Sequence, residues 1–277
     1  MKREALMNEI FSMTNSTKLI LLDDKKYILR VPGKGTDKLI NRHQEYEVYK
    51  KIMPYMISDE VLYFDEVSGI KIARYIDNCH NVNPRNSKDV RVAMKAIKHL
   101  HNLDLHVDFD FDLKEKINFY ESLMKSSKYK DYEDVKHLVF NLLDEVDKYA
   151  GQHCLCHIDP NQDNILINNV DNEVKALVDW EYAAMQDPLL DVAMFAIYAN
   201  YNKKEIDSLL KTYIDGECVE SDVTVFKYYV YISAAGLLWS NWCEYKNQLG
   251  QFFGGTYEQS QYNYAKTYSK FAKEMLK

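Results

Sequence analysis

The sequence predicts an α+β protein with two lobes, a small strand-rich N-terminal lobe and a larger, mainly helical C-terminal lobe. Short apolar runs separated by turn residues fill the first third of the chain, which is typical of strands and hairpins. A polar stretch, DNCHNVNPRNSKD at 77–89, is typical of a linker. Beyond it, apolar residues recur mostly at helical spacing. We therefore expect lobes at residues 1–77 and 78–277.

The N-terminal lobe is predicted to hold strands and one helix in the order β-β-α-β-β. The runs TKLILL and KYILRV flank the turn DDK, and the runs VLYF and GIKIARYI flank the turn DEVSG. Each pair is expected to form a hairpin. Between the pairs, KLINRHQEYEVYKKIM has helical periodicity. A small sheet with one helix packed on it is the expected result.

The C-terminal lobe is predicted to be a set of helices interrupted by short strands. Ser87 is a suitable N-cap for a first helix. Further helices are expected at about 113–125, 131–149, 188–201, 203–213, 221–247 and 257–276. The run 225–242 is long and apolar but contains Lys227 and several polar residues. Because membrane spans need about 20 almost uncharged residues, we expect a buried helix there rather than a membrane segment.

Composition excludes some classes of function. The formal net charge is -7, so the basic surface that nucleic-acid binding requires is missing. The N-terminal residues lack the apolar core of a signal peptide. Five cysteines with no framework spacing suit a reducing compartment. We expect a cytoplasmic protein that binds neither membrane nor nucleic acid.

One constellation indicates catalysis. The segment CHIDPNQDN, at 156–164, carries His157, Asp159 and Asn164, and the apolar run VKALVD ends at Asp179. We expect HCLC, NILIN and VKALVD to be strands, so that these side chains lie in loops fixed by strands on both sides. Phosphoryl transfer needs such a set: one carboxylate to accept the proton of the attacking hydroxyl, and an asparagine and a second carboxylate to hold magnesium.

Two other interpretations of this segment remain open. Asp, Asn and Pro are ordinary turn residues, so the segment could be a polar turn between strands. The cysteines of HCLCH could bind zinc, but no second ligand pair follows at zinc-site spacing. Cys154 and Cys156 are therefore expected to pack as small apolar groups. The full H-x-D-x-x-x-x-N pattern beside a strand that ends in aspartate favours catalysis.

These motifs resemble a known family. CHIDPNQDNILI and ALVDWEYAAMQDPLLDVA are similar to the catalytic core of the choline/ethanolamine kinases, which are related to the aminoglycoside phosphotransferases and share the protein-kinase-like fold. MTN, YILRVPGKGTDKLINR, GIKIARYI and VDWEYAAMQDP resemble segments of bacterial choline kinases in the same order. The resemblance implies a two-lobed protein-kinase-like fold and an ATP-dependent kinase that uses Mg²⁺.

The resemblance also implies roles for individual residues. Asp159 corresponds to the catalytic base, Asn164 and Asp179 to the magnesium ligands, and His157 to a brace of the loop. Asp191 resembles an acid that supports this loop. Arg30 takes the place of the strand lysine that contacts nucleotide phosphates, with Glu45 as its partner on the following helix. An arginine can hold phosphate and carboxylate together, although strand alternation alone also allows Arg30 to be a surface residue.

Nucleotide binding is expected at two further segments. The sequence PGKGT lacks the Walker spacing, and the resemblance implies that Ser12, Thr14 and Asn15 cover the phosphates. Relatives carry two glycines before the M-T-N, where this chain has Phe11 and Ser12, and that difference affects nucleotide affinity rather than fold. The resemblance places adenine against the backbone at the lobe hinge, which corresponds to Arg74, Tyr75 and Ile76.

The substrate is expected to meet aromatic residues. A quaternary ammonium has no hydrogen-bond donor and is held by aromatic faces. Trp239 and Trp242 share a helix face in WSNW, and Tyr182 and Tyr257 are further candidates, as the resemblance to the choline pocket implies. Glu181 and Asp159 complete the predicted substrate site. The alternative is that aromatic residues on an apolar helix belong to the core.

The sequence therefore predicts phosphorylation of the hydroxyl of choline, a small-molecule substrate, by ATP. A kinase for ethanolamine, an aminoglycoside or another hydroxylated amine is the nearest alternative. A catalytically silent binding module is a second alternative, suggested by the altered phosphate loop. A protein-kinase role is disfavoured, because DWE stands in place of D-F-G and no A-P-E segment follows. The sequence leaves the oligomeric state unknown.

Overall fold

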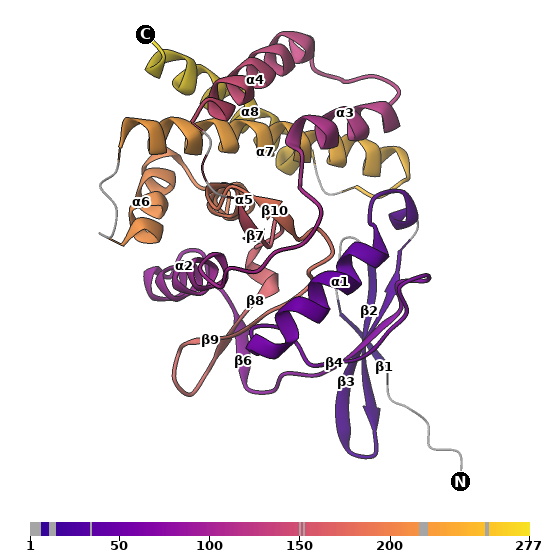
Figure 1. The fold of residues 1–277 in the computed structure, drawn as a ribbon. Coiled ribbons are helices and arrows are strands. Elements are labelled where there is room, and N and C mark those ends of the chain that lie inside the picture. Colours follow the sequence, from indigo (N-terminus) through magenta and orange to yellow (C-terminus); the bar gives the residue numbers. More distant parts are fainter. Residues whose placement is uncertain are drawn as a thin grey trace.

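The computed structural model describes residues 7–10, 15–33, 35–149, 151, 153–215, 221–252 and 255–277. Strands of the N-terminal lobe form one end of the molecule, and a larger body of helices forms the other (Figure 1). The α+β class and the division into a strand-rich and a helical part are confirmed. The boundary after residue 77 stays a prediction.

The N-terminal lobe contains an antiparallel sheet with the strand order β1-β2-β3-β5-β4. Its strands are β1 (Met7–Ile10), β2 (Asn15–Leu22), β3 (Lys25–Pro32), β4 (Val61–Phe64) and β5 (Lys71–Arg74). Both predicted hairpins are present, as β2–β3 and β4–β5. The expected order of elements missed β1, because its four residues, MNEI, are too few to show an alternating pattern.

One helix, α1 (Arg42–Ile52), packs on this sheet. Asn41 caps it by accepting a hydrogen bond from the backbone N–H of Gln44 at 3.2 Å. Its buried face brings the ring of Tyr49 to 6.0 Å from that of Phe64 in β4, measured between centroids. Short 3-10 turns, η1 (Thr36–Lys38) and η2 (Met53–Tyr55), flank the helix.

The C-terminal lobe is helical, as predicted. Its helices are α2 (Ser87–His101), α3 (Leu113–Leu123), α4 (Tyr132–Asp147), α5 (Leu189–Tyr198), α6 (Lys203–Ile214), α7 (Asp222–Gln248) and α8 (Gly255–Met275). The predicted N-cap of α2 is wrong by one residue. Asn86 is the cap and accepts from the N–H of Lys88 at 3.0 Å, while Ser87 is the first helical residue.

Short strands lie between the helices and the N-terminal lobe. They are β6 (Cys79–Asn81), β7 (Cys154–Cys156), β8 (Ile165–Asn168), β9 (Val174–Leu177) and β10 (Ala184–Gln186), with the turn η3 (Gln162–Asn164) before β8. The three strands predicted around the catalytic segment are present as β7, β8 and β9. The predicted linker is not wholly irregular: its β6 pairs with β8, because tertiary pairing gives a partner to three residues that show no strand pattern.

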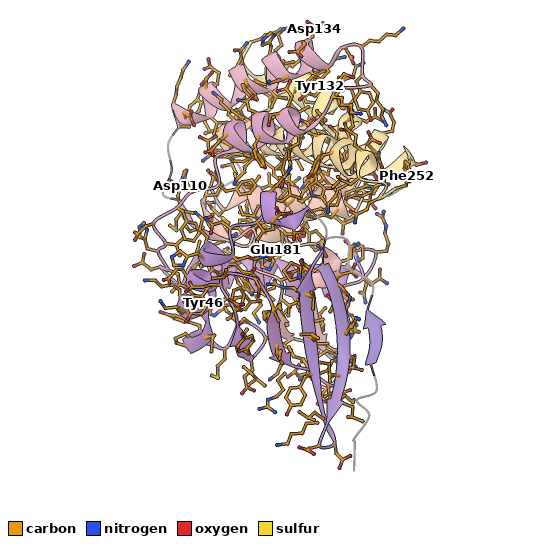
Figure 2. All side chains as sticks on the ribbon, turned by 90° about the vertical axis from the view of Figure 1, so that its right-hand side faces the viewer. Tyr46, Asp110, Tyr132, Asp134, Glu181 and Phe252 are labelled. Carbon is orange, nitrogen blue, oxygen red and sulfur yellow. The ribbon has the colours of Figure 1, made fainter. Side chains whose placement is uncertain are left out.

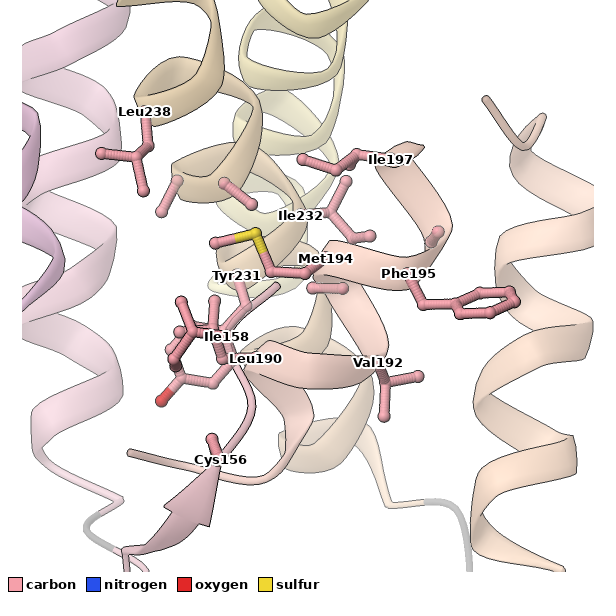
Figure 3. Packing of buried hydrophobic residues seen from close by; sticks show 14 of the residues in the cluster. Cys156, Ile158, Leu190, Val192, Met194, Phe195, Ile197, Tyr231, Ile232 and Leu238 are labelled. Carbon is pink, nitrogen blue, oxygen red and sulfur yellow. The ribbon is translucent and has the colours of Figure 1, made fainter. Parts of the chain in front are cut away.

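The core of the C-terminal lobe surrounds α7, which is buried along most of its length. Residues of α5 and α7, such as Met194, Ile197 and Ile232, pack together with Ile158 of the catalytic segment (Figure 3). A Cβ added at Gly236 would meet the backbone oxygen of Gln261 at 2.6 Å, so glycine lets α8 cross α7 closely. The apolar run 225–242 is thus a buried helix, and no helix in the described part of the chain is long and apolar enough to cross a bilayer.

Candidate active site between the lobes

The segment CHIDPNQDN, predicted to be catalytic, is held in place by Asp191, a fully buried residue of α5. Its carboxylate accepts hydrogen bonds from the backbone N–H of His157 at 2.8 Å and of Ile158 at 2.7 Å. Ile158 has a φ of 67°, an unusual value for a β-branched residue. The two hydrogen bonds hold the backbone in this strained form, and the next residue along the chain is Asp159.

His157 supports the same loop from inside. Its side chain is buried, its Nε2 lies 3.0 Å from the carbonyl oxygen of Val178, and its ring centroid is 4.6 Å from that of Trp180. Burial lowers the pKa of His157, so the neutral form with Nε2–H donating to the carbonyl is favoured. His101, which the sequence did not single out, lies with its Nε2 2.9 Å from the carboxylate of Asp191.

Asp159 is placed by two asparagines. Asn164 donates from Nδ2 to the backbone oxygen of Asp159 at 2.9 Å and to its carboxylate at 3.1 Å. Asn161, which was not predicted, donates to both carboxylate oxygens at 3.2 Å. Burial raises the pKa of Asp159 to about 8, and the negative charges of Asp179 and Glu181 add to this rise.

Asp179 lies on the neighbouring segment, with its side chain 28% exposed and a φ of 65°. The N–H of Val178 donates to the backbone oxygen of Asn164 at 2.9 Å, which ties the two segments together. Oxygen atoms of this kind are the ligands that magnesium prefers. Burial is the main reason for the raised pKa of Asp159, and the repulsion from Asp179 and Glu181 that adds to it is what a divalent cation would relieve.

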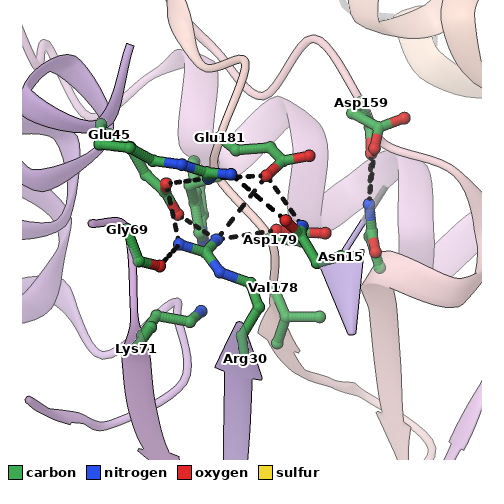
Figure 4. Close-up of polar contacts among 12 residues, drawn as sticks. Asn15, Arg30, Glu45, Gly69, Lys71, Asp159, Val178, Asp179 and Glu181 are labelled. Atoms are coloured by element: carbon green, nitrogen blue, oxygen red, sulfur yellow. Dashed lines mark hydrogen bonds and ion pairs between the residues drawn. The ribbon is translucent and has the colours of Figure 1, made fainter. Parts of the chain in front are cut away.

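Arg30 faces this cluster from β3, so it is not a surface residue of the strand. Its guanidinium donates through both terminal nitrogens to Glu45 of α1, at 3.0 Å for Nη2, and to the backbone oxygen of Gly69 at 3.1 Å. Its Nη1 also lies 3.3 Å from the carboxylate of Asp179. Figure 4 shows Arg30 between Glu45 and Asp179. The ion pair expected from the sequence is therefore present.

A second buried arginine, Arg42, completes the cluster and was not predicted. It donates to Glu45 at 2.8 Å and to Glu181 at 2.9 Å. Asn15, at the start of β2, donates to the same oxygen of Glu181 at 3.0 Å and accepts from Arg42 at 3.2 Å. Arg42 lies three residues before Glu45 on one helix face, a spacing from which the contact could have been inferred.

Glu181 thereby connects the lobes, and Figure 2 shows it at the level where the strands meet the helical body. Burial raises the pKa of Glu181 to about 7, helped by Asp179 and opposed by the two arginines. Beside it is a cavity of about 480 Å³. N-terminal residues 37–41 and 44 line one side, and Asp110, Phe111, residues 115–116, Phe119 and residues 181–184 line the other.

The predicted nucleotide-binding residues are only partly described. Ser12 and Thr14 lie outside the described residues, as does Phe11. At the predicted hinge, the N–H of Arg74 donates to the oxygen of Glu60 at 2.9 Å and that of Tyr75 to the oxygen of Lys26 at 3.2 Å. These two amides are engaged within the N-terminal lobe, and an adenine contact at 74–76, including Ile76, stays a prediction.

Aromatic side chains also gather near Asp159. The ring of Trp239 lies 5.9 Å from that of Tyr182, 5.5 Å from that of Tyr198 and 5.2 Å from that of Trp242, between centroids. The charge of Asp159 raises the pKa of Tyr198 and also that of Tyr257, although burial is the larger cause for both. The structure therefore brings the predicted aromatic residues together near Asp159, within the hydrophobic core of the lobe.

Among the described residues, Cys154 and Cys156 of β7 do not form a complete metal site. The sulfurs of Cys154 and Cys156 are 3.8 Å apart, and His101 offers a third ligand atom within 4.8 Å. Both ring nitrogens of His101 are already engaged, with Asp191 and with the hydroxyl of Tyr213 at 2.8 Å. To bind a metal ion together with the two cysteines, His101 would have to give up one of these contacts.

Comparison with known proteins agrees with this geometry. Residues 12–228 match the model of the phosphotransferase enzyme family, and the chain belongs to that family. Protein LicA of Haemophilus influenzae is 27% identical over 255 residues, which are 87% of this chain and 93% of that protein. The crystal structure of choline kinase LicA from Streptococcus pneumoniae has a TM-score of 0.84 and 28% identity, and the match covers 97% of this chain and 94% of that one.

A structure of LicA in complex with AMP gives a TM-score of 0.82 at 28% identity, and covers 97% of this chain and 93% of that one. The predicted two-lobed kinase-like fold and the resemblance to bacterial choline kinases are thus confirmed. The protein is a phosphotransferase of the choline kinase and aminoglycoside phosphotransferase type.

Proposed function

We propose that the protein transfers the γ-phosphoryl group of ATP to the hydroxyl of choline and so forms phosphocholine. The observation that carries the proposal is the position of Asp159. Both the acidic residues Asp179 and Glu181, which are bonded to the buried arginines, and the aromatic rings around Trp239 lie near it. A base near both a phosphate-handling site and a cation-binding site suits an amino alcohol as acceptor.

The nucleotide is assigned to the cleft between the proposed lobes 1–77 and 78–277. Asn164 and Asp179 would hold Mg²⁺, which would neutralise charge on the phosphates. Arg30, oriented by Glu45, would contact the phosphates directly, and the AMP complex of LicA supports a nucleotide at this fold. Ser12, Thr14 and Asn15 are proposed to cover the phosphates, and residues 74–76 to face adenine.

Asp159 is proposed to orient the acceptor hydroxyl and to take its proton. The oxygen then forms a bond to the γ-phosphorus while the bond to the β,γ-bridging oxygen breaks, and that electron pair leaves with ADP. Catalysis of this kind depends on positioning and electrostatic stabilisation. The rigid support of the loop by Asp191 and by His157 meets the first of these needs.

The substrate ammonium is assigned to the aromatic side. Trp239 and Trp242 of α7, with Tyr182 and Tyr257, are proposed to contact a cation that has no N–H to donate. Each such contact contributes roughly 0.5–2 kcal/mol when desolvated. Glu181, which adjoins Tyr182 at the cavity, adds negative charge at this edge. A reducing, ATP-rich compartment, the cytoplasm, is the proposed location, in keeping with the free cysteines among the described residues.

The test is phosphate transfer from MgATP to choline, ethanolamine and an aminoglycoside, compared by kcat/KM. We expect choline to be preferred, because a primary ammonium would lack hydrogen-bond acceptors on the aromatic faces. A clear preference for a primary amine would reject choline and leave the kinase assignment in place. No transfer to any acceptor, together with no thermal shift at millimolar MgATP, would instead identify a silent binding module.

A further inference from the structure

A third buried cation lies beside the site, and the mechanism above does not use it. Lys246 is on α7, seven residues after Trp239 and four after Trp242, so the three share one helix face. Its side chain is fully buried, and Nζ lies 5.4 Å from the centroid of the Trp242 ring. The helix face that carries the two tryptophans proposed to bind the substrate therefore also carries an ammonium group.

Lys246 differs from the other buried cations of the site in its contacts. Arg30 and Arg42 each donate to carboxylates. The Nζ of Lys246 has no hydrogen-bond acceptor among the described residues. Burying an ammonium without an acceptor is costly, and burial indeed lowers the pKa of Lys246, with Glu181 as the charge that opposes this. An anionic ligand would provide the missing acceptor.

The position of Lys246 in the fold indicates the chemical class of this anionic ligand. The turn of α7 that carries it reaches the N-terminal lobe, where a Cβ added at Gly35 would meet Leu249 at 3.1 Å and Tyr245 at 3.3 Å. Glu181, whose charge acts on Lys246, accepts a hydrogen bond from Asn15, the described member of the set predicted to cover the phosphates. Lys246 is thus at the junction of the phosphate side and the acceptor side.

We propose that Lys246 binds the phosphoryl group on the acceptor side, during transfer and in the phosphorylated product. The inference rests on the proposed function. The ammonium of the substrate would lie on the aromatic faces of α7, and the phosphate of the product would be held by Lys246 one turn further along. Its ammonium keeps its protons throughout: the proton of the acceptor goes to Asp159 and the electron pair of the breaking bond goes to ADP. Lys246 stabilises charge and takes no part in proton transfer.

The test compares Lys246→Met with Lys273→Met, which removes an exposed lysine from α8. We expect Lys246→Met to lower kcat about 10²- to 10³-fold, the loss typical of one preorganised donor, with little change in the KM for choline. Calorimetric titration should show weaker binding of phosphocholine and unchanged binding of choline. Lys246→Arg should restore part of the kcat, and Lys273→Met should resemble the wild type.

A structural role for Lys246 gives a different result. If Lys246→Met weakens choline and phosphocholine equally, or leaves kcat unchanged, the inference is wrong. If the variant fails to fold, Lys246→Arg decides by the same ratio of product to substrate affinity. If the wild type phosphorylates ethanolamine instead of choline, the proposed substrate fails, but the comparison of phosphoethanolamine with ethanolamine still tests Lys246.

Discussion

The two halves of the site differ in how their buried charges are compensated. In the interlobe cluster, Arg30 and Arg42 are matched by Glu45, Glu181 and Asp179, with hydrogen bonds between them (Figure 4). In the aromatic half, the rings of Trp239, Trp242, Tyr182 and Tyr198 pack together, and Lys246 of α7 has no acceptor among the described residues. The first half is organised before any ligand binds, whereas the second is organised for a ligand that supplies charge. Substitutions in the two halves should therefore differ in their effects on stability and on activity.

The largest effect is expected at Asp159, which is near both halves of the site. Asp159→Ala removes the proposed base, and turnover should fall at least about 10²- to 10⁴-fold, the range of general-base catalysis. MgATP binding should be largely kept, since Arg30, Asn164 and Asp179 remain. Steady-state kinetics and nucleotide titration measure the two quantities. Asp163→Ala, an exposed aspartate in the same segment, is the matched control, and unchanged turnover in Asp159→Ala would refute the assignment of the base.

In the charged half, stability and activity should separate. Arg30→Met leaves Glu45 buried beside one arginine instead of two and should cost about 3–5 kcal/mol in the free energy of unfolding. The double variant Arg30→Met with Glu45→Met should recover much of that stability, because both charges are gone, but not the turnover. Urea denaturation and kinetics test this. Recovery of activity in the double variant would show that Arg30 serves the fold and not the phosphates.

In the aromatic half, a substitution should affect substrate binding more than stability. Trp242→Leu keeps an apolar side chain but removes the ring face, so the KM for choline should rise about 10-fold, equivalent to about 1.4 kcal/mol. The uncharged analogue 3,3-dimethyl-1-butanol has the same shape as choline and separates the two causes. Its KM should change little. Equal changes for both alcohols would mean that Trp242 acts by packing alone.

The sequence predicts the parts of this site whose residues are close together along the chain, and it misses contacts between residues far apart along the chain. Asp159, Asn164 and Asp179 lie in one motif between short strands, so their proximity follows from local pattern. Arg42 and Asn15 bind Glu181 from the other lobe, 139 and 166 positions away in the chain. Hydrophobic periodicity describes only short segments, so it cannot predict contacts between residues this far apart in the sequence. Strand β6 was missed for the same reason, since pairing with β8 defines it.

The smallest effect is expected at His157, whose side chain supports the loop that carries Asp159, and it concerns the pH dependence of stability. Because burial lowers the folded-state pKa of His157 below 6.5, the unfolded state binds more protons, and stability is lost as the pH falls below about 6.5. The slope from this group is at most about 1.4 kcal/mol per pH unit. Denaturation between pH 7 and 5 should show a weaker slope in His157→Gln than in the wild type. His106→Gln, which changes a mostly exposed histidine, should keep the slope.

The left-handed backbone at Ile158 has a consequence for engineering. A β-branched residue at a φ of 67° stores strain of about 1–3 kcal/mol, which the hydrogen bonds to Asp191 maintain. Glycine there would relieve the strain, yet it would remove a buried side chain and free the peptide that precedes Asp159. Because the loss of a fully buried isoleucine side chain costs at least about 2–5 kcal/mol, more than the strain that glycine would relieve, stability and the geometry that holds the proposed base both favour isoleucine at this position.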